Sequence, residues 1–267
     1  MREFCGLSSE EIKKNCLDLG EKPFRSKQLT DWVYQKGILD PSKMGNLSKV
    51  FKEKLEKDIV FSSLNLCEIN HSDDEETLKF LWRIPSGNLV ESVLISSGSR
   101  RTVCISSQVG CPVRCAFCAS GKKGLIQNLS AGQIVEQVVR INQFLYEKGE
   151  RVSHLVFMGM GEPLENYEAV IKAIKILIDK NLYGISPRRI TLSTAGVVPA
   201  IGKLLNEKLN INLALSLHAP NQQIRKRIIP YARKYQLNEV LSSVRTYAKD
   251  SKRDITYEYI LIEGLND

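Results

Sequence analysis

The chain has 267 residues, of which 43% are hydrophobic and 25% are charged. These proportions are ordinary for a folded soluble protein, and the length allows one large α/β domain with a small accessory domain. The net charge of +8 suits a polyanionic partner such as RNA, although charge alone identifies no partner.

Targeting and membrane signals are missing from the sequence. No apolar signal segment follows Met1, and no uncharged apolar run approaches the roughly 18 residues that a membrane helix needs. We therefore predict a cytoplasmic protein without a membrane partner. In that compartment the seven cysteines are expected to be metal ligands, catalytic thiols or core residues, and not a disulfide framework.

The first hundred residues divide into a helical part and a strand part. Apolar residues at helical spacing predict helices at residues 10–19, 26–37 and 47–55. Residues 77–84 and 89–95 then alternate as strands around Pro85-Ser86-Gly87-Asn88, which reads as a hairpin turn. We predict a helical domain at residues 1–58 and a β-hairpin extension at residues 59–100.

From residue 101 onward, strands and helices alternate with short connections. The strands are predicted at residues 101–108, 153–158, 189–194, 211–217 and 255–262. The helices are predicted at residues 130–148, 166–180, 198–208 and 237–249, the first with Ser130 and Gln133 at capping-box spacing. This order favours right-handed βα units, a parallel sheet and a partial or full barrel over residues 101–267.

Three cysteines lie within eight residues, at Cys111, Cys115 and Cys118. Three soft thiolates can hold one metal centre, and an iron–sulfur cube with three protein ligands keeps one iron open for reaction. A closed zinc site with Cys104 as the fourth ligand is the alternative, although zinc sites usually use Cys-x2-Cys pairs.

Other unusual segments occupy equivalent places after the predicted strands. They are Gly159 to Pro163, Ser193 to Gly196, Ser216 to Pro220 and the turn at Gly264. In a parallel α/β barrel the loops at the carboxyl ends of the strands collect the reactive groups. These segments and the cysteine loop are therefore expected at one mouth.

The combined motifs resemble a known family. Cys-x3-Cys-x-Phe-Cys resembles the radical S-adenosylmethionine (radical SAM) signature. With the motifs around Glu91, Cys104, Gly161, Ser193 and Ser216 in the same order, the chain resembles the RlmN/Cfr family of RNA adenine methyltransferases, and RlmN more than Cfr. The resemblance implies a partial (β/α)6 radical SAM barrel that lacks its last strand, preceded by the helical domain and the hairpin.

The resemblance also implies cofactors and residue roles. Cys111, Cys115 and Cys118 would hold a [4Fe–4S] cluster that cleaves SAM to a radical. Glu91 would accept a proton, and Cys104 would resolve a protein–RNA crosslink by forming a disulfide. The residues implied to bind SAM are Gly161 and Glu162, at its amino group, and Ser193, Ser216, Leu217 and His218.

By the same resemblance, the substrate is C2 of adenine in 23S rRNA and some tRNAs, reached through a methylcysteine. An electron donor such as flavodoxin would reduce the cluster of a monomeric enzyme. No cysteine follows Cys118, and the sequence stops in a turn that could cap another helix. We therefore expect a C-terminally truncated chain that cannot complete methyl transfer.

Two alternatives stay open at this point. One is a metal-stabilised RNA-binding protein without catalysis, and the other is a Cfr-type enzyme that acts at C8. A basic cluster is predicted as a solvated helix face, or at most as a phosphate contact. Its members are Arg225, Lys226, Arg227, Arg233 and Lys234.

Overall fold

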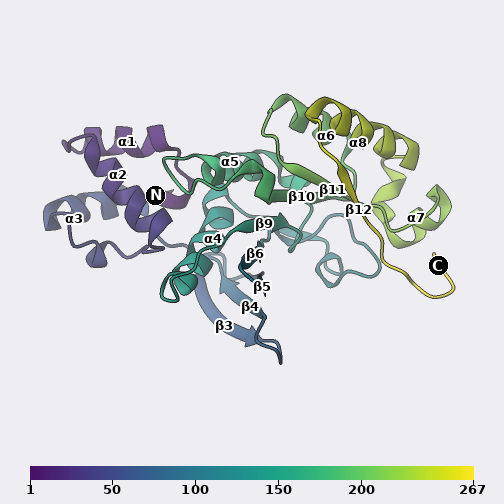
Figure 1. Cartoon of the computed structure of the whole chain (residues 1–267), viewed down its shortest axis with the longest axis horizontal. Coiled ribbons are helices and arrows are strands. Elements are labelled where there is room, and N and C mark those ends of the chain that lie inside the picture. Colours follow the sequence, from purple (N-terminus) through teal and green to yellow (C-terminus); the bar gives the residue numbers. More distant parts are fainter. The chain divides into compact units, whose positions relative to one another are not determined.

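The computed structural model describes residues 1–267, which form two compact units. The first unit comprises Met1–Ile105, Leu129–His154 and Glu168–Ser186. The second unit comprises Ser106–Asn128, Leu155–Tyr167 and Pro187–Asp267. Each unit is therefore assembled from separate stretches of the chain, and each is described by itself below (Figure 1). No helix in either unit combines the length and the apolar character that a membrane span requires.

Three helices near the N-terminus begin the first unit, as predicted. They are α1 (Ser9–Asp18), α2 (Phe24–Thr30), which continues as one π-helical turn to Gln35, and α3 (Lys49–Asp58). A capping box of Ser8 and Glu11 starts α1. The short strands β1 (Arg2–Glu3) and β2 (Ile59–Val60) pair in parallel, which joins the two ends of this helical segment.

An antiparallel sheet forms the rest of the first unit, together with α4 (Ala131–Tyr146) and α5 (Tyr167–Ile178). Its strands, in spatial order, are β3 (Asn65–His71), β4 (Thr77–Arg83), β5 (Leu89–Ser97) and β6 (Arg100–Cys104). The predicted hairpin is confirmed, since β4 pairs with β5 across the Pro85 turn. The strand predicted at residues 101–108 is corrected, because β6 ends at Cys104 and a separate strand starts at Gln108.

One face of this sheet is buried, since buried and more exposed residues alternate along β4 and β5. Phe80 and Trp82 of β4 stack with ring centroids 5.5 Å apart, and Phe80 meets Phe144 edge to face. The Trp82 indole N–H donates to Ser92 Oγ, and Ser92 Oγ donates to Gln137 of α4. These three buried polar side chains of β4, β5 and α4 therefore satisfy one another.

The Glu136 carboxylate organises the connection between the N-terminal helices and the sheet. Glu136 lies in α4, is 2% exposed, and accepts hydrogen bonds from the backbone N–H groups of Ser63 and Leu64 at 2.8 and 3.1 Å. The hydroxyls of Ser62 and Ser63 donate to the same carboxylate at 2.8 and 2.7 Å. Arg140 completes the set as an ion-pair partner at 3.4 Å. The buried carboxylate therefore accepts hydrogen bonds from the polar groups of residues 62–64, which have no secondary structure of their own.

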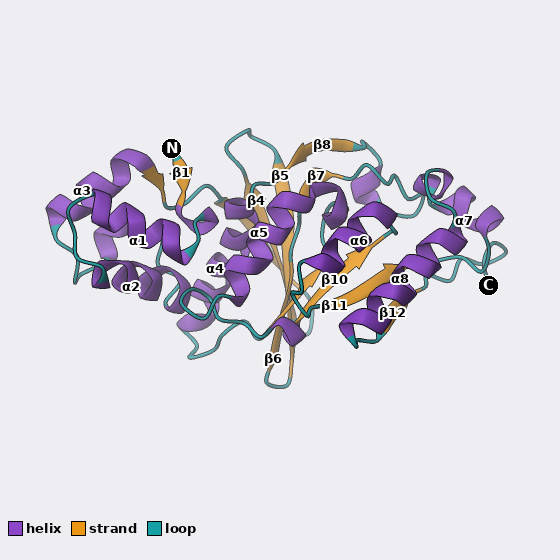
Figure 2. Ribbon diagram, turned by 90° about the horizontal axis from the view of Figure 1, so that it is seen from above, coloured by secondary structure: helices purple, strands orange, loops and turns teal.

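The second unit is built on a parallel sheet of four strands. They are β9 (His154–Phe157), β10 (Ile190–Thr194), β11 (Asn212–Ser216) and β12 (Ile255–Glu258). Helices α6 (Val198–Asn206) and α8 (Leu237–Ser251) cover one face of this sheet (Figure 2). The predicted α/β architecture with parallel strands is confirmed, and a short helix, α7 (Gln222–Ile228), is added after β11.

The last strand is shorter than predicted, since β12 ends at Glu258 and not at Ile262. The next backbone groups bond to side chains and not to a neighbouring strand. The Ile260 N–H donates to His218 Nδ1 at 3.0 Å, and the Ile262 N–H donates to Asn266 Oδ1 at 2.7 Å. The apolar pattern predicted that the β12 strand continues to Ile262. Instead, side-chain acceptors take the backbone N–H groups after Glu258, and the strand ends there.

Replacing Glu136 by alanine is expected to lower the free energy of unfolding by about 3 kcal/mol, because the N–H groups of Ser63 and Leu64 stay buried without an acceptor. Glu136→Gln keeps one carbonyl acceptor and is expected to lose less. Urea unfolding followed by circular dichroism measures both values. The control is Glu147→Gln, at an exposed position directly after the C-terminal end of α4. Equal stability of Glu136→Ala and the wild type would contradict this role.

Candidate functional site

The cysteine loop is held between two short strands of the second unit. These strands, β7 (Gln108–Gly110) and β8 (Leu125–Asn128), are antiparallel, and the three cysteines lie between them. Gly110 has φ +72°, and a Cβ there would lie 2.0 Å from the carbonyl oxygen of Gly124. Only glycine fits this close approach, which lets the Cys111 N–H donate to Gly124 O at 3.0 Å. The base of the loop is therefore closed by backbone contacts.

All three cysteines line one cavity of about 220 Å³ in the second unit. The carboxyl ends of β9, β10 and β11 supply further lining residues, among them Gly161, Glu162, Ser193, Ser216 and His218. Three of the expected segments, at Gly159 to Pro163, Ser193 to Gly196 and Ser216 to Pro220, therefore contribute to one cavity with the cysteine loop, whereas the Gly264 turn does not line it. The predicted SAM residue outside the lining is Leu217, whose N–H donates to the carbonyl oxygen of Glu258.

The thiols of the loop suit a metal cluster more than a free nucleophile. The pKa of Cys111 is raised to about 11 and that of Cys115 to about 12. Burial is the largest cause, and neighbouring acidic groups, including the other thiols, contribute to both increases. Without a metal these thiols stay protonated at neutral pH, and metal binding has to displace their protons. No three His, Cys, Asp or Glu side chains of the chain surround a single ion. A cluster does not require that arrangement, since each thiolate binds a different iron.

Glu162 places a buried carboxyl group in the same cavity. Its side chain is 3% exposed and accepts hydrogen bonds from the N–H groups of Ala195 at 2.7 Å and Leu164 at 3.1 Å. Burial nevertheless raises the pKa of Glu162 to about 7. The neighbouring Gly161 has φ +105°, and a Cβ there would lie 2.6 Å from Cβ of Gln108. Glycine is therefore needed at position 161, beside the carboxyl group. A cationic ligand group in the cavity would stabilise the ionised form of Glu162.

Three polar side chains at the ends of β10, β11 and β12 form a hydrogen-bonded group that we call the acceptor cluster. The hydroxyls of Ser193 and Ser216 both donate to Oε2 of Glu258, each at 2.8 Å. The two hydroxyl oxygens also lie 3.2 Å apart, and either can donate to the other. Each hydroxyl has a single hydrogen, so both hydrogens can be used within the cluster, on Glu258 or on the other serine. What the cluster offers to the cavity is therefore only acceptor oxygens, which suit a ligand with N–H or O–H donors or positive charge.

Glu258 is a residue of this site that the sequence reasoning missed. Glu258 lies inside the strand predicted at residues 255–262, because the apolar pattern runs on to Ile262 and points to the Gly264 turn as the strand end. The observed β12 ends at Glu258, which places this carboxylate at the strand end. In the parallel register Ser216 lies opposite Glu258, so both side chains point to the same face.

His218 joins the cavity through an unusual backbone conformation. It has φ +53°, which is uncommon for a residue other than glycine. The Phe117 ring of the cysteine loop meets the imidazole edge to face, with centroids 4.9 Å apart. Burial lowers the pKa of His218, and its Nδ1 accepts the Ile260 N–H. The imidazole is therefore neutral at pH 7, with its other nitrogen as the remaining polar group.

Glu91 and Cys104 lie in the first unit, on the antiparallel sheet. Val93 is opposite Cys104 in the β5–β6 ladder, and Glu91 precedes Val93 by two residues. The side chains of Glu91 and Cys104 are therefore diagonal neighbours on one face of this sheet. Glu91 is partly exposed and forms an ion pair with Lys79 at 3.3 Å. The implied disulfide of Cys104 is not supported, since all seven cysteines are free thiols.

The structure corrects the reading of the basic cluster at Arg225, whereas Arg227, Arg233 and Lys234 are exposed, as expected of a solvated face. Arg225 is 1% exposed, and its guanidinium donates to the carbonyl oxygens of Leu217, Ala195 and Ser216 at 3.1, 2.6 and 3.1 Å. It is thus neither a solvated residue nor a phosphate contact. The reading failed because a charged residue one helical turn from exposed neighbours looks the same in sequence whether it faces water or the interior.

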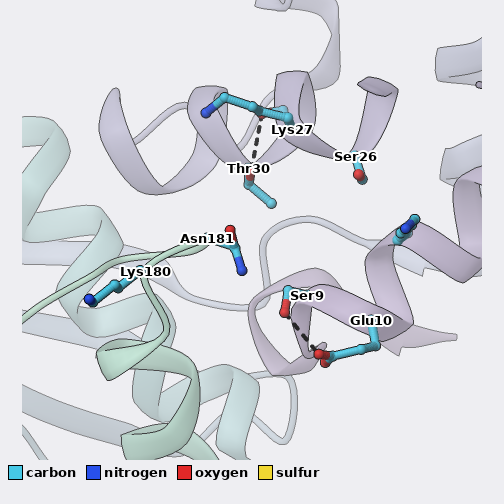
Figure 3. Close-up of a pocket in the computed structure, with 8 residues that line it drawn as sticks. Ser9, Glu10, Ser26, Lys27, Thr30, Lys180 and Asn181 are labelled. Carbon is cyan, nitrogen blue, oxygen red and sulfur yellow. Dashed lines mark hydrogen bonds between the residues drawn. The ribbon is translucent and has the colours of Figure 1, made fainter. Parts of the chain in front are cut away.

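A second cavity, of about 370 Å³, lies in the first unit and contains none of the predicted site residues. In Figure 3, α1, α2 and the loop after α5 surround it with polar side chains. The Ser9 hydroxyl also donates to Asp179 at 2.6 Å. The lining residues are Ser9, Glu10, Lys13, Ser26, Lys27, Thr30, Lys180 and Asn181.

The raised pKa of Glu162 has a consequence for stability. The folded carboxyl titrates at about 7 against an ordinary value of 4.5, so the folded state holds the proton more tightly. The stability that the proton contributes is fully present below pH 4.5 and is lost as the pH rises through 7. Metal-free Glu162→Gln is therefore expected to gain on the wild type between pH 4.5 and 8, by on the order of 3 kcal/mol.

Urea unfolding of the metal-free proteins across this pH range measures the difference. Cys111 and Cys115 stay protonated throughout the range and add nothing to it. The exposed Glu263→Gln removes the same charge outside the cavity and is expected to follow the wild type. A constant difference between Glu162→Gln and the wild type would refute the raised pKa.

Comparison with known proteins accounts for this arrangement. Residues 3–60 match the ribosomal RNA large subunit methyltransferase N-terminal domain, and residues 105–267 match the radical SAM superfamily. A probable dual-specificity RNA methyltransferase RlmN 2 of Protochlamydia amoebophila is 58% identical over 93% of this chain and 69% of its own length. The RlmN of Symbiobacterium thermophilum is 45% identical over 98% of this chain and 70% of its own length.

A solved structure agrees with these relatives. The crystal structure of a radical SAM methyltransferase from Sphaerobacter thermophilus superposes with a TM-score of 0.97 at 37% identity, over all of this chain and 78% of that one. The expected partial radical SAM barrel is confirmed, and with it the dependence of the family on a [4Fe–4S] cluster and SAM. The chain belongs to the RlmN family of radical SAM RNA methyltransferases.

Proposed function

We propose that this chain carries the SAM-cleaving site of an enzyme that methylates C2 of adenine in 23S rRNA and in some tRNAs through a methylcysteine, and that residues 1–267 do not include that cysteine. The observation that carries the proposal is the single cavity that gathers three loop cysteines, the Glu162 carboxyl and the acceptor cluster. Thiols, a carboxyl group and oxygen acceptors are the groups needed to seat a cluster and a cationic amino-acid nucleoside side by side. A Cfr-type reaction at C8 would use the same cavity and stays the alternative.

In this proposal Cys111, Cys115 and Cys118 hold the [4Fe–4S] cluster. The protonated thiols of Cys111 and Cys115 release their protons on loading, so assembly is favoured by higher pH. When bound, the cluster supplies the electron that cleaves SAM reductively. Cys111 and Val113, at 9% and 3% exposure, shield the base of the cysteine loop from water.

The remaining cavity residues are assigned to SAM. Glu162, buried and short of a cation, and Gly161 would bind the amino group. Ser193, Ser216 and Glu258 offer only acceptor oxygens, so they suit the ribose hydroxyls and exclude the SAM carboxylate. His218 and the backbone at Leu217 would contact the rest of the molecule.

Glu91 and Cys104 are proposed as the catalytic pair that acts on the RNA adduct. Glu91 would accept the proton lost from the substituted carbon of adenine. The Cys104 thiolate would then attack the sulfur of the methyl-carrying cysteine, so that a sulfur–sulfur bond forms as the carbon–sulfur bond to the RNA breaks and the electron pair passes to the adenine product. Their support is the shared sheet face, on which both side chains are diagonal neighbours. Their partial exposure leaves them accessible to a bulky substrate.

The proposal includes the partners of the reaction. The first unit would grip RNA through its backbone, with Lys13, Lys27 and Lys180 around the second cavity as candidate phosphate contacts. A donor such as flavodoxin would supply electrons to a monomer. Since these RNAs are cytoplasmic, a cytoplasmic location belongs to the same proposal.

Anaerobic reconstitution of residues 1–267 with iron and sulfide is expected to give a brown protein with about four irons per chain that cleaves SAM on reduction. Cys118→Ser is expected to lose the cluster, because the loop then supplies only two thiolates. The control is Cys67→Ser, which removes an exposed thiol from the first unit. Iron analysis and chromatography of the cleaved nucleoside measure both effects.

The same samples separate the alternatives. One bound zinc with no SAM cleavage would favour the non-catalytic RNA-binding protein and refute the enzyme. Since no cysteine lies between Cys118 and Asp267, this polypeptide is expected to cleave SAM without methylating RNA. Methylated adenine in the RNA digest would disprove that expectation, and its mass spectrum would distinguish C2 from C8.

Glu258→Gln is expected to weaken SAM binding to the cluster-loaded protein about tenfold, because a charged acceptor for the ribose hydroxyls becomes a neutral amide. Equilibrium dialysis with labelled SAM measures the dissociation constant. Glu263→Gln, five residues on and exposed, removes the same charge and should bind SAM like the wild type. Unchanged affinity in Glu258→Gln would exclude a contact with the ligand.

A further inference from the structure

We propose that Arg225 is a positioning residue of the cluster and SAM site. Its guanidinium fixes the carboxyl ends of β10 and β11 and places a buried positive charge beside the cysteine loop, which favours the reduced form of the bound cluster. Nothing in the sequence pattern assigned this role, and the inference rests on the proposed seat of the cluster at Cys111, Cys115 and Cys118.

The hydrogen bonds of Arg225 show what it fixes. The Nε atom donates to Leu217 O, and Nη2 donates to Ala195 O and Ser216 O. Ala195 follows β10 directly, Ser216 ends β11, and Leu217 follows β11 directly. The planar fork of a guanidinium can bridge separate acceptors in a way that an ammonium cannot. One side chain from α7 therefore sets the spacing of two strand ends that carry Ser193 and Ser216 into the cavity.

The helix that carries Arg225 is also fastened to the cysteine loop. The N–H of Ala116, next to Cys115, donates to the carbonyl oxygen of Ile228 at the end of α7 at 2.8 Å. Ile228 packs in one apolar cluster with Cys111 and Val113. Helix α7 thus contacts the loop at its C-terminus and the strand ends through Arg225. A shift of either would move the cysteines relative to the SAM residues.

The charge of Arg225 is buried without a contact ion pair. Its hydrogen-bond partners are three neutral carbonyls, and the acidic groups that act on it electrostatically are Cys115 and Glu162. Burial lowers the pKa of Arg225, yet a guanidinium stays charged at neutral pH. An uncompensated buried cation is costly to the fold. Bound thiolates and an added electron would compensate it, since reduction makes the cluster more negative.

Four variants separate the charge from the geometry. Arg225→Met removes both the charge and the donors, and Arg225→Lys keeps the charge but loses the fork. Arg227→Met and Arg227→Lys make the same changes at an exposed position of the same helix. All are reconstituted with iron and sulfide. The midpoint potential of the cluster is measured by a redox titration followed by electron paramagnetic resonance, and SAM affinity by equilibrium dialysis.

Arg225→Met is expected to have a more negative midpoint potential and about tenfold weaker SAM binding. Arg225→Lys is expected to keep the wild-type potential and still lose SAM affinity several-fold, a split that a general loss of packing would not give. Both Arg227 variants are expected to match the wild type. If Arg225→Met does not fold, Arg225→Gln replaces it as the neutral variant that is compared with Arg225→Lys. Glutamine is neutral but keeps an amide donor.

A neutral variant at position 225 with the wild-type potential and SAM affinity would overturn the proposal. So would a lysine variant whose potential falls as far as that of the neutral variant, since charge would then not be the cause. Failure of the wild type itself to assemble a cluster that cleaves SAM would count against the proposed function, and would leave the hydrogen bonds of Arg225 as a structural brace only.

Discussion

The parallel pairing of β10, β11 and β12 is the constraint on which the site depends. In this register Ser193 lies opposite Ala214, and Ser216 lies opposite Glu258. Because opposite residues of parallel strands point to the same face, three polar side chains from distant parts of the chain meet without any contact in sequence. A shift of one residue in either strand pair would turn these side chains to the other face and dissolve the acceptor cluster.

Three buried charges are fixed in different ways, and the differences indicate their roles. Glu136 accepts hydrogen bonds from backbone N–H groups and forms an ion pair with Arg140, so its charge is fully compensated and its role is structural. Glu162 accepts two backbone N–H groups, yet burial still raises its pKa to about 7, so it is left receptive to a cation. Arg225 has only neutral partners. The two charges that lack a counter-ion are therefore both in the unit that holds the cavity, where ligands can supply one.

Hydrogen-bond direction adds information that a list of polar residues does not hold. Ser193 and Ser216 alone could donate to a carboxylate or accept from a hydroxyl. Once both hydroxyl hydrogens are used on Glu258 or between the two serines, the group can only accept. The same reasoning explains His218, whose Nδ1 accepts a backbone N–H and so fixes the tautomer of the neutral ring. Each case turns an ambiguous polar side chain into one with a defined ligand preference.

The sequence by itself determined the local chemistry and the order of the elements. Cysteine spacing identified the loop, Ser130 and Gln133 marked the start of α4, and alternating strands and helices indicated a parallel sheet, because these signals lie within a few consecutive residues. Only the tertiary structure decided that Arg225 is interior, that β12 ends at Glu258, and that Glu258 commits the two serines. Those outcomes depend on carbonyls, hydroxyls and N–H groups contributed by residues far away in the chain. Local periodicity carries no record of them, since burial and hydrogen-bond direction are set by the partner and not by the residue alone.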